Sequence, residues 1–160
     1  MNPTLARVLA LVRILIGVGF VWVGVSLLMD HGFLYGGLLE HLTATGGPVR
    51  HYLRMYLFIE RHETAFAFLS ASASICAGVF LVTGTLVSLT SLGASALVLN
   101  YALASSSGNW PRFLALFAVA GVLLLLGRLA AGLTWGVDGW LIEHLEDWLV
   151  LFPLRRRAPQ

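Results

Sequence analysis

The longest uncharged stretch of the chain covers residues 64–111, between Glu63 and Arg112. A helix needs about 20 apolar residues to cross roughly 30 Å of hydrocarbon, so this stretch can hold two crossings joined by a tight turn. A shorter apolar stretch, long enough for one further crossing, flanks it on each side. The pattern therefore predicts an all-α, integral membrane four-helix bundle with crossings at about residues 9–29, 65–86, 88–105 and 113–131.

Composition narrows the class further. Hydrophobic residues make up 58% of the 160 positions and charged residues only 11%, which excludes an ordinary soluble globular domain. The net charge of +2 is too small to indicate nucleic-acid binding. We expect two parts: a transmembrane domain at residues 1–137, which includes an external loop at residues 30–63, and an interfacial helix with a basic tail at residues 138–160.

The arginines set the expected orientation, because the chain contains no lysine. Four crossings place both termini on one side, and the cytoplasmic side of a membrane protein carries the excess of basic residues. The side of the termini carries six arginines and the other side four: Arg7, Arg13, Arg128, Arg155, Arg156 and Arg157, against Arg50, Arg54, Arg61 and Arg112. We therefore expect both termini in the cytoplasm, with the protein in a bacterial inner membrane.

The external loop is long for a connection between bundled helices, so ordered structure is expected in it. Phe33–Ala44 and Val49–Glu63 are predicted as two short interfacial helices on either side of a Gly-Gly-Pro break. Three arginines of the second helix fall within about 40° of one another on a helical projection and form one basic stripe: Arg50, Arg54 and Arg61. The stripe either binds a small anion or anchors the loop to lipid phosphates.

The C-terminal segment Gly139–Phe152 has the pattern of an amphipathic helix in the membrane interface. Its apolar face is rich in tryptophan and leucine, whereas its polar face carries Glu143, Glu146 and Asp147. An acidic face is unusual for a helix that only binds anionic lipid. These three carboxylates are therefore predicted to bind a partner protein with a basic surface.

Two arginines, Arg13 and Arg128, lie inside the ends of their predicted crossings. Each is about four residues from its helix end, or about 6 Å below the interface at 1.5 Å per residue. Asp138 is the nearest acidic residue in sequence that could balance them. The three residues either hold a quinone head group or brace the first and fourth crossings, unless both arginines snorkel to the lipid head groups.

Small and polar residues inside the crossings predict helix contacts. Ser70, Ser74 and Gly78 follow the four-residue spacing of small residues that lets helices approach closely in lipid. Close contacts are also expected at three further glycines: Gly17, Gly24 and Gly121. Cys76 is expected to be a buried packing residue. Asn100 and Tyr101 are polar groups for which the sequence offers no explanation.

The sequence predicts no intrinsic cofactor and no metal site. All five histidines lie outside the predicted crossings, so none is placed to ligate a transmembrane haem. The single cysteine cannot form an internal disulfide or a Cys-x-x-Cys motif, and no His or carboxylate spacing typical of a metal site occurs. Quinone, lipid or pigment at the protein edge remains the expected cofactor class.

Several short motifs resemble the DoxX/DoxD family of small four-helix membrane proteins. They lie at Arg13–Gly17, Gly78–Gly84, Asn100–Leu103 and from Gly127 to Asp138. The long first external loop is similar to that of the DoxD branch, which supplies the membrane subunit of thiosulfate:quinone oxidoreductase. The sequence departs from the family at Ser74 and Ser88, where members commonly carry a Glu and an Arg.

Two functions follow from this resemblance. One is an accessory or structural subunit of a larger respiratory or photosynthetic membrane complex. The other is a quinone-reducing oxidoreductase subunit that acts on thiosulfate or a similar small anion, with the basic loop stripe attracting the anion and Arg13 or Arg128 orienting the quinone. The absence of any electron-carrier motif in the sequence favours the accessory role.

Overall fold

The computed structural model describes residues 3–38, 62–105, 110–129 and 135–144 of the chain. This part is helical and contains no strand. It comprises four long helices and two short ones: α1 (Pro3–Met29), η1 (Phe33–Gly37), α4 (Glu63–Thr83), α5 (Val87–Ser105), α6 (Trp110–Arg128) and α7 (Val137–His144).

Three of these helices are long and apolar enough to cross a membrane: Thr4–Met29 of α1, α4 and α6. Their length and composition are those of an integral membrane protein. The apolar stretch Val87–Ala102 of α5 is shorter than the other three. The observed helices differ from the predicted crossings mainly at their ends, with α1 beginning six residues earlier and α4 ending three residues earlier than expected.

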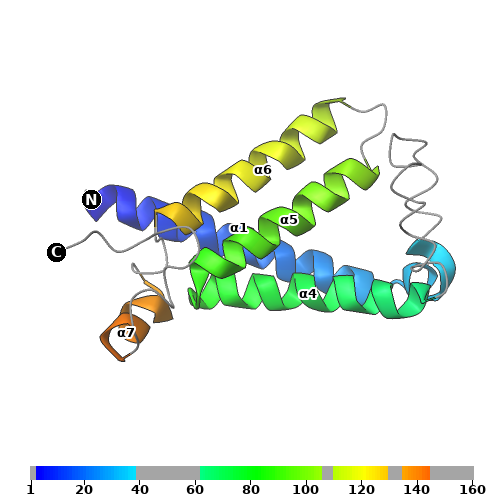
Figure 1. The fold of residues 1–160 in the computed structure, drawn as a ribbon, viewed down its shortest axis with the longest axis horizontal. Coiled ribbons are helices and arrows are strands. Elements are labelled where there is room, and N and C mark those ends of the chain that lie inside the picture. The colour runs from blue at the N-terminus through cyan, green and yellow to red at the C-terminus, as the bar shows by residue number, and fades with distance from the viewer. Residues whose placement is uncertain (1–2, 39–61, 106–109, 130–134, 145–160) are drawn as a thin grey trace.

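The long helices pack in two pairs, α1 along α4 and α5 along α6. The pairs are connected mainly through α4 and α5, whereas α1 and α6 touch little. Figure 1 shows that the pairs meet at the end near α7 and diverge toward the other end, where α5 and α6 rise away from α1 and α4. The buried core lies where the pairs meet side by side, around Ala77, Leu81, Ala94 and Leu123.

Glycines allow α1 and α4 to pack backbone to backbone. A Cβ atom at Gly17 would lie 2.9 Å from the Gly78 carbonyl oxygen, and one at Gly78 would lie 2.7 Å from the Gly17 carbonyl oxygen. A Cβ atom at Gly24 would meet the Ala71 carbonyl oxygen at 2.9 Å. Close contact maximises van der Waals attraction, which drives helix association where lipid removes the hydrophobic driving force. The contacts predicted at Gly17, Gly24 and Gly78 are confirmed.

Two expectations about packing are wrong. A Cβ atom at Gly121 would meet nothing within 4 Å, so this glycine makes no close helix contact. Cys76 is exposed on the outside of α4 rather than buried. Both errors have one cause: a membrane helix is apolar on its lipid-facing side as well as on its packed side, so an apolar or small residue does not indicate which side it occupies.

The predicted interfacial helices are described only in part. η1 covers the start of Phe33–Ala44, and Tyr35 and Gly36 depart from helical backbone angles within it. Residues 39–61, which include most of Val49–Glu63, lie outside the described residues. α7 begins two residues before the predicted segment Gly139–Phe152, and residues 145–152 of that segment also lie outside the described part.

Candidate functional site

The turn between α4 and α5 is the starting point of a polar site at the end where the helix pairs meet. Gly84 ends α4 in the left-handed conformation, with φ 71° and ψ 39°, and its N–H donates to the Phe80 carbonyl. This is the usual role of glycine after a helix, since a left-handed residue with a Cβ is strained. A Cβ atom at Gly84 would also lie 2.6 Å from Arg13 Nη1 and 2.6 Å from Gly136 Cα.

Asp138 caps the start of α5 from a distant part of the sequence. Its Oδ1 accepts a hydrogen bond from the Leu86 N–H at 2.5 Å, and its Oδ2 accepts one from the Val87 N–H at 2.9 Å. Its own N–H donates to the Gly84 carbonyl at 2.9 Å. The first N–H groups of a helix have no partner within the helix, and a negative charge is favourable at the positive end of the helix dipole.

Arg13 reaches this turn from α1 and is fully buried. Its Nη2 donates to the Trp135 carbonyl at 2.9 Å, and its positive charge acts on the Asp138 carboxylate. Burial raises the pKa of the Asp138 carboxyl, whereas the Val87 and Leu86 N–H groups and the charge of Arg13 act to lower it. Among the described residues, Arg13 and Asp138 are the two charged side chains that are buried. We call this cluster with Gly84 and Trp135 the Arg13–Asp138 junction.

Two strained residues are held by the charged groups of the junction. Among the described residues, Leu86 and Trp135 are the non-glycine residues with positive φ, at 48° and 54°. Such a backbone costs about 1–3 kcal/mol and persists only where the surroundings impose it. Here the Leu86 N–H is held by Asp138 and the Trp135 carbonyl by Arg13. The buried charges therefore fix the path of the chain before α5 and before α7.

A buried serine supplements the junction. Ser88, one residue into α5, donates from its Oγ to the Gly127 carbonyl of α6 at 3.0 Å. In this chain a short hydroxyl thus links α5 to the end of α6.

The structure brings together Arg13 and Asp138, two of the three residues that the sequence predicted to lie close to one another. Arg128 is exposed at the end of α6 and is not among the groups that act on Asp138. The basic stripe of Arg50, Arg54 and Arg61 lies outside the described residues, as do Glu146 and Asp147. Glu143 belongs to α7, but its side chain is not described.

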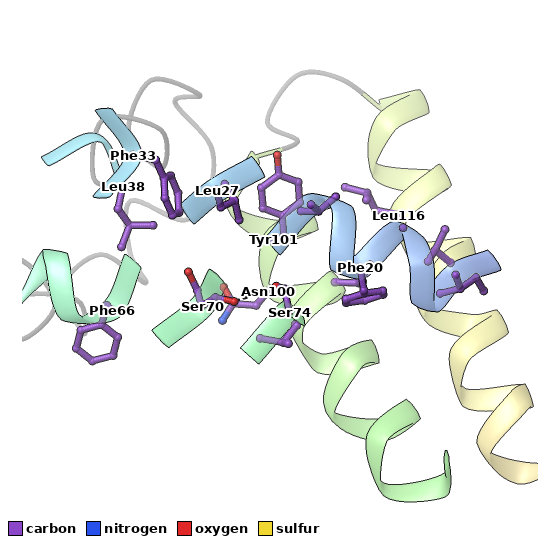
Figure 2. Close-up of a pocket in the computed structure, with 16 residues that line it drawn as sticks. Phe20, Leu27, Phe33, Leu38, Phe66, Ser70, Ser74, Asn100, Tyr101 and Leu116 are labelled. Carbon is purple, nitrogen blue, oxygen red and sulfur yellow. Dashed lines mark hydrogen bonds between the residues drawn. The ribbon is translucent and has the colours of Figure 1, made fainter. Parts of the chain in front are cut away.

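A second feature occupies the space between the diverging helix pairs: an apolar cavity of about 660 Å³. All four long helices and η1 contribute to its lining, which is mainly aliphatic and aromatic. Its polar side chains are Ser70 and Ser74 from α4 and Asn100 and Tyr101 from α5, and Figure 2 shows these four with the apolar groups around them. The cavity accounts for Asn100 and Tyr101, which the sequence alone left unexplained.

Tyr101 links the cavity lining to α6. Its hydroxyl accepts a hydrogen bond from Arg112 Nη2 at 3.0 Å, and the Arg112 guanidinium carbon lies 5.8 Å from the centre of its ring. Tyr101 thus gives its ring to the cavity lining and its hydroxyl to an arginine at the start of α6. The pair connects α5 to α6 at the end opposite the Arg13–Asp138 junction.

Helices and sites together define the class: an all-helical membrane protein with a charged structural junction at one end and an apolar cavity toward the other. Among the described residues, no group of three His, Cys, Asp or Glu side chains could hold a metal ion. No protein-family model matches the chain, and no solved structure matches it.

Proposed function

We propose that this chain is a DoxX-like accessory subunit of a larger membrane redox complex, respiratory or photosynthetic. In this proposal α5 crosses the membrane with the other three long helices, so that they form a four-helix bundle with both termini in the cytoplasm. The subunit contributes a docking surface and no electron carrier of its own. Lipid, quinone or pigment can occupy its edge.

One observation carries the proposal: the buried charges Arg13 and Asp138 are used to position α7. A buried charge pair contributes little net stability when compared with apolar packing. We therefore interpret Arg13 and Asp138 by the conformation that they impose on the chain. Here the junction fixes the direction in which the chain leaves the helix pairs and enters α7. Figure 1 shows α7 standing to one side of the long helices.

The surface that is held in this way suits a protein partner. Trp135 is 61% exposed and Trp140 is 60% exposed, and tryptophan is enriched at the energetic centres of protein interfaces. The sequence continues with the carboxylates Glu143, Glu146 and Asp147. Anionic lipid head groups repel such a face, whereas a basic partner attracts it. We infer that α7 and the acidic residues that follow it bind a basic surface of another subunit.

Purification from native membranes in mild detergent tests the proposal, with co-eluting chains and pigments identified by mass spectrometry and absorption. Replacing Glu143, Glu146 and Asp147 with Gln, Gln and Asn should release the chain from its partners without affecting membrane insertion. Trp140→Ala should act in the same direction. Trp110→Ala is the matched control, because Trp110 is 71% exposed but lies on α6 at the opposite end.

Two outcomes contradict the proposal. If the purified chain alone reduces quinone with thiosulfate, and Arg50→Ala with Arg54→Ala abolishes this activity, then the chain is an oxidoreductase subunit. If it purifies alone from native membranes in every mild detergent tested, then it has no stable partner. Orientation is tested separately with a membrane-impermeant thiol reagent in intact cells: a cysteine at position 46 should be labelled and one at position 158 should not.

A further inference from the structure

The cavity between the helix pairs has the size and lining of a ligand site. Its volume of about 660 Å³ lies within the roughly 300–1,000 Å³ of small-molecule pockets. At about 30 Å³ for each water-sized group, it has room for roughly 20 non-hydrogen atoms. The α1 and α6 walls are apolar, with Phe20, Val23 and Leu116 among their side chains. Such a lining does not hold water, and the described lining residues include no charge that could balance an ionic head group.

The polar groups on the α4 wall are oriented to accept hydrogen bonds. Ser70 Oγ donates to the Ala67 carbonyl at 2.9 Å, and Ser74 Oγ donates to the Ser70 carbonyl at 2.9 Å. Each hydroxyl has one proton, so both protons are committed to the backbone of their own helix. The remaining lone pairs can accept a hydrogen bond from a molecule in the cavity. Figure 2 shows Ser70 and Ser74 on neighbouring turns of α4 in the cavity wall.

We propose that the cavity binds an uncharged, single-chain amphiphile whose head group is a hydroxyl. The alkyl chain of this amphiphile fills the apolar space between the helix pairs, and its hydroxyl donates a hydrogen bond to Ser70 or Ser74. A molecule with an ether in place of the hydroxyl has no proton to donate, and an alkane has no polar head at all. At the α4 wall the alcohol differs from the other two molecules by this one hydrogen bond. The proposed site does not depend on the partner-binding role proposed for α7.

Gly19 provides a way to close the cavity without disturbing the helices. It lines the cavity from α1, and a Cβ atom there would meet nothing within 4 Å. A leucine at this position therefore extends into the open space. Gly121 is the matched control, since a Cβ atom there also meets nothing within 4 Å, but Gly121 does not line the cavity. Both substitutions favour helix formation, because glycine is a poor helix former.

The test measures binding of three probes by native mass spectrometry of the full chain: hexadecan-1-ol, 1-methoxyhexadecane and hexadecane, presented in the same detergent micelles. We expect the alcohol to bind about fivefold more tightly than the ether, which is the effect of one hydrogen bond. Gly19→Leu should lower the affinity for the alcohol at least tenfold, and Gly121→Leu should leave it unchanged. Ser70→Ala with Ser74→Ala should remove the preference for the alcohol over the ether, but the cavity should still bind the alkyl chain of both probes.

Each alternative result overturns a defined part of the proposal. Equal binding of the alcohol and the ether by the unmodified chain excludes recognition of the hydroxyl. Unchanged binding by Gly19→Leu, in protein whose melting temperature is not lowered, excludes the cavity as the site. No binding of any probe, together with no co-purified amphiphile in lipid extracts of the protein, excludes the ligand class.

Discussion

Asp138 and Leu86 stand 52 positions apart in the sequence, yet the carboxylate of one accepts the backbone N–H of the other at 2.5 Å. This contact, with its partner at Val87, means that the first turn of α5 is capped by a residue that follows α6. α5 therefore has a complete N-terminus only after α6 has packed and the chain has returned. Arg13 brings α1 to the same point. The junction thus couples both helix pairs to α7.

The first prediction concerns the carboxylate of Asp138. Asp138→Asn keeps the shape of the side chain but replaces one acceptor oxygen with an NH₂ group, which faces either the Leu86 or the Val87 N–H. A buried donor left without an acceptor costs about 1–3 kcal/mol. We therefore expect a lower melting temperature in mild detergent, with unfolding measured by tryptophan fluorescence. Asp30→Asn is the control, because Asp30 is exposed and, within the described residues, its side chain accepts one hydrogen bond, from the Phe33 N–H at 3.2 Å. Equal shifts for both variants would show that the junction is not a special point of stability.

The second prediction concerns the turn at Gly84. Gly84→Ala puts a Cβ on a residue with φ 71° and brings it to 2.6 Å from Arg13 Nη1 and Gly136 Cα. The backbone strain alone costs about 1–2 kcal/mol, and displacement of Arg13 adds to it. We expect a clear loss of thermal stability. Gly93 lies in helix α5, and a Cβ atom there would meet nothing within 4 Å. Gly93→Ala should therefore be neutral or stabilising by up to about 1 kcal/mol.

A neutral Gly84→Ala variant would contradict the close approach of Arg13 to this turn. The two variants together also separate two effects of glycine. At Gly93 only helix propensity changes, whereas at Gly84 the conformation and the neighbouring arginine both matter.

The third prediction concerns the contact between α1 and α4. Gly78→Ala places a Cβ 2.7 Å from the Gly17 carbonyl oxygen and from the Val21 backbone nitrogen, so α1 must move outward. Overpacking of this kind costs about 1–3 kcal/mol. We expect a lower melting temperature for Gly78→Ala and no loss for Gly121→Ala, whose Cβ is in open space. A Gly78→Ala variant as stable as Gly121→Ala would show that the two backbones do not touch.

The sequence predicted those features that depend on local composition. The uncharged run gives the approximate positions of α4 and α5. The matched depth of Arg13 and Arg128 indicated the need for a nearby carboxylate, and Asp138 is the acidic residue nearest to them in sequence. The cap on α5 was not predictable, because the residues at the start of a helix do not indicate that an aspartate 52 positions later will accept their N–H groups. The serine pair in α4 was assigned to helix contact, but Ser70 and Ser74 line the cavity.

The cavity itself has no sequence signal, for a physical reason. It arises because the helix pairs meet at one end and diverge at the other, and crossing angles depend on how all the side chains at an interface interdigitate. Apolar residues that face a cavity, a neighbouring helix or lipid have the same composition. Asn100 and Tyr101 were polar residues without an explanation in an apolar segment, and the sequence did not indicate that they face a cavity.

The last prediction uses Cys76, whose exposed thiol was not expected. Cys76 lies 13 positions after Glu63, so it is roughly 20 Å along α4 at 1.5 Å per residue. An exposed residue in the interior of a membrane-crossing helix faces lipid. In intact membranes we expect a lipophilic maleimide to label Cys76 slowly, because the reactive thiolate forms rarely in hydrocarbon, and a sulfonated, membrane-impermeant maleimide to leave it unlabelled. Both reagents should label the protein after denaturation in SDS, which sets the full extent of reaction.

A neighbouring position supplies the control for this labelling. Ala77 is buried at nearly the same depth, so Ala77→Cys in a Cys76→Ala background should resist both reagents until the protein is denatured. If the lipophilic reagent labels position 77 as fast as position 76, α4 is rotated relative to the packing against α1. If the sulfonated reagent labels Cys76 in intact membranes, this face of α4 contacts water. In that case α4 does not cross the membrane as its length and hydropathy predict, because only thiols accessible from the aqueous phase react with a charged maleimide.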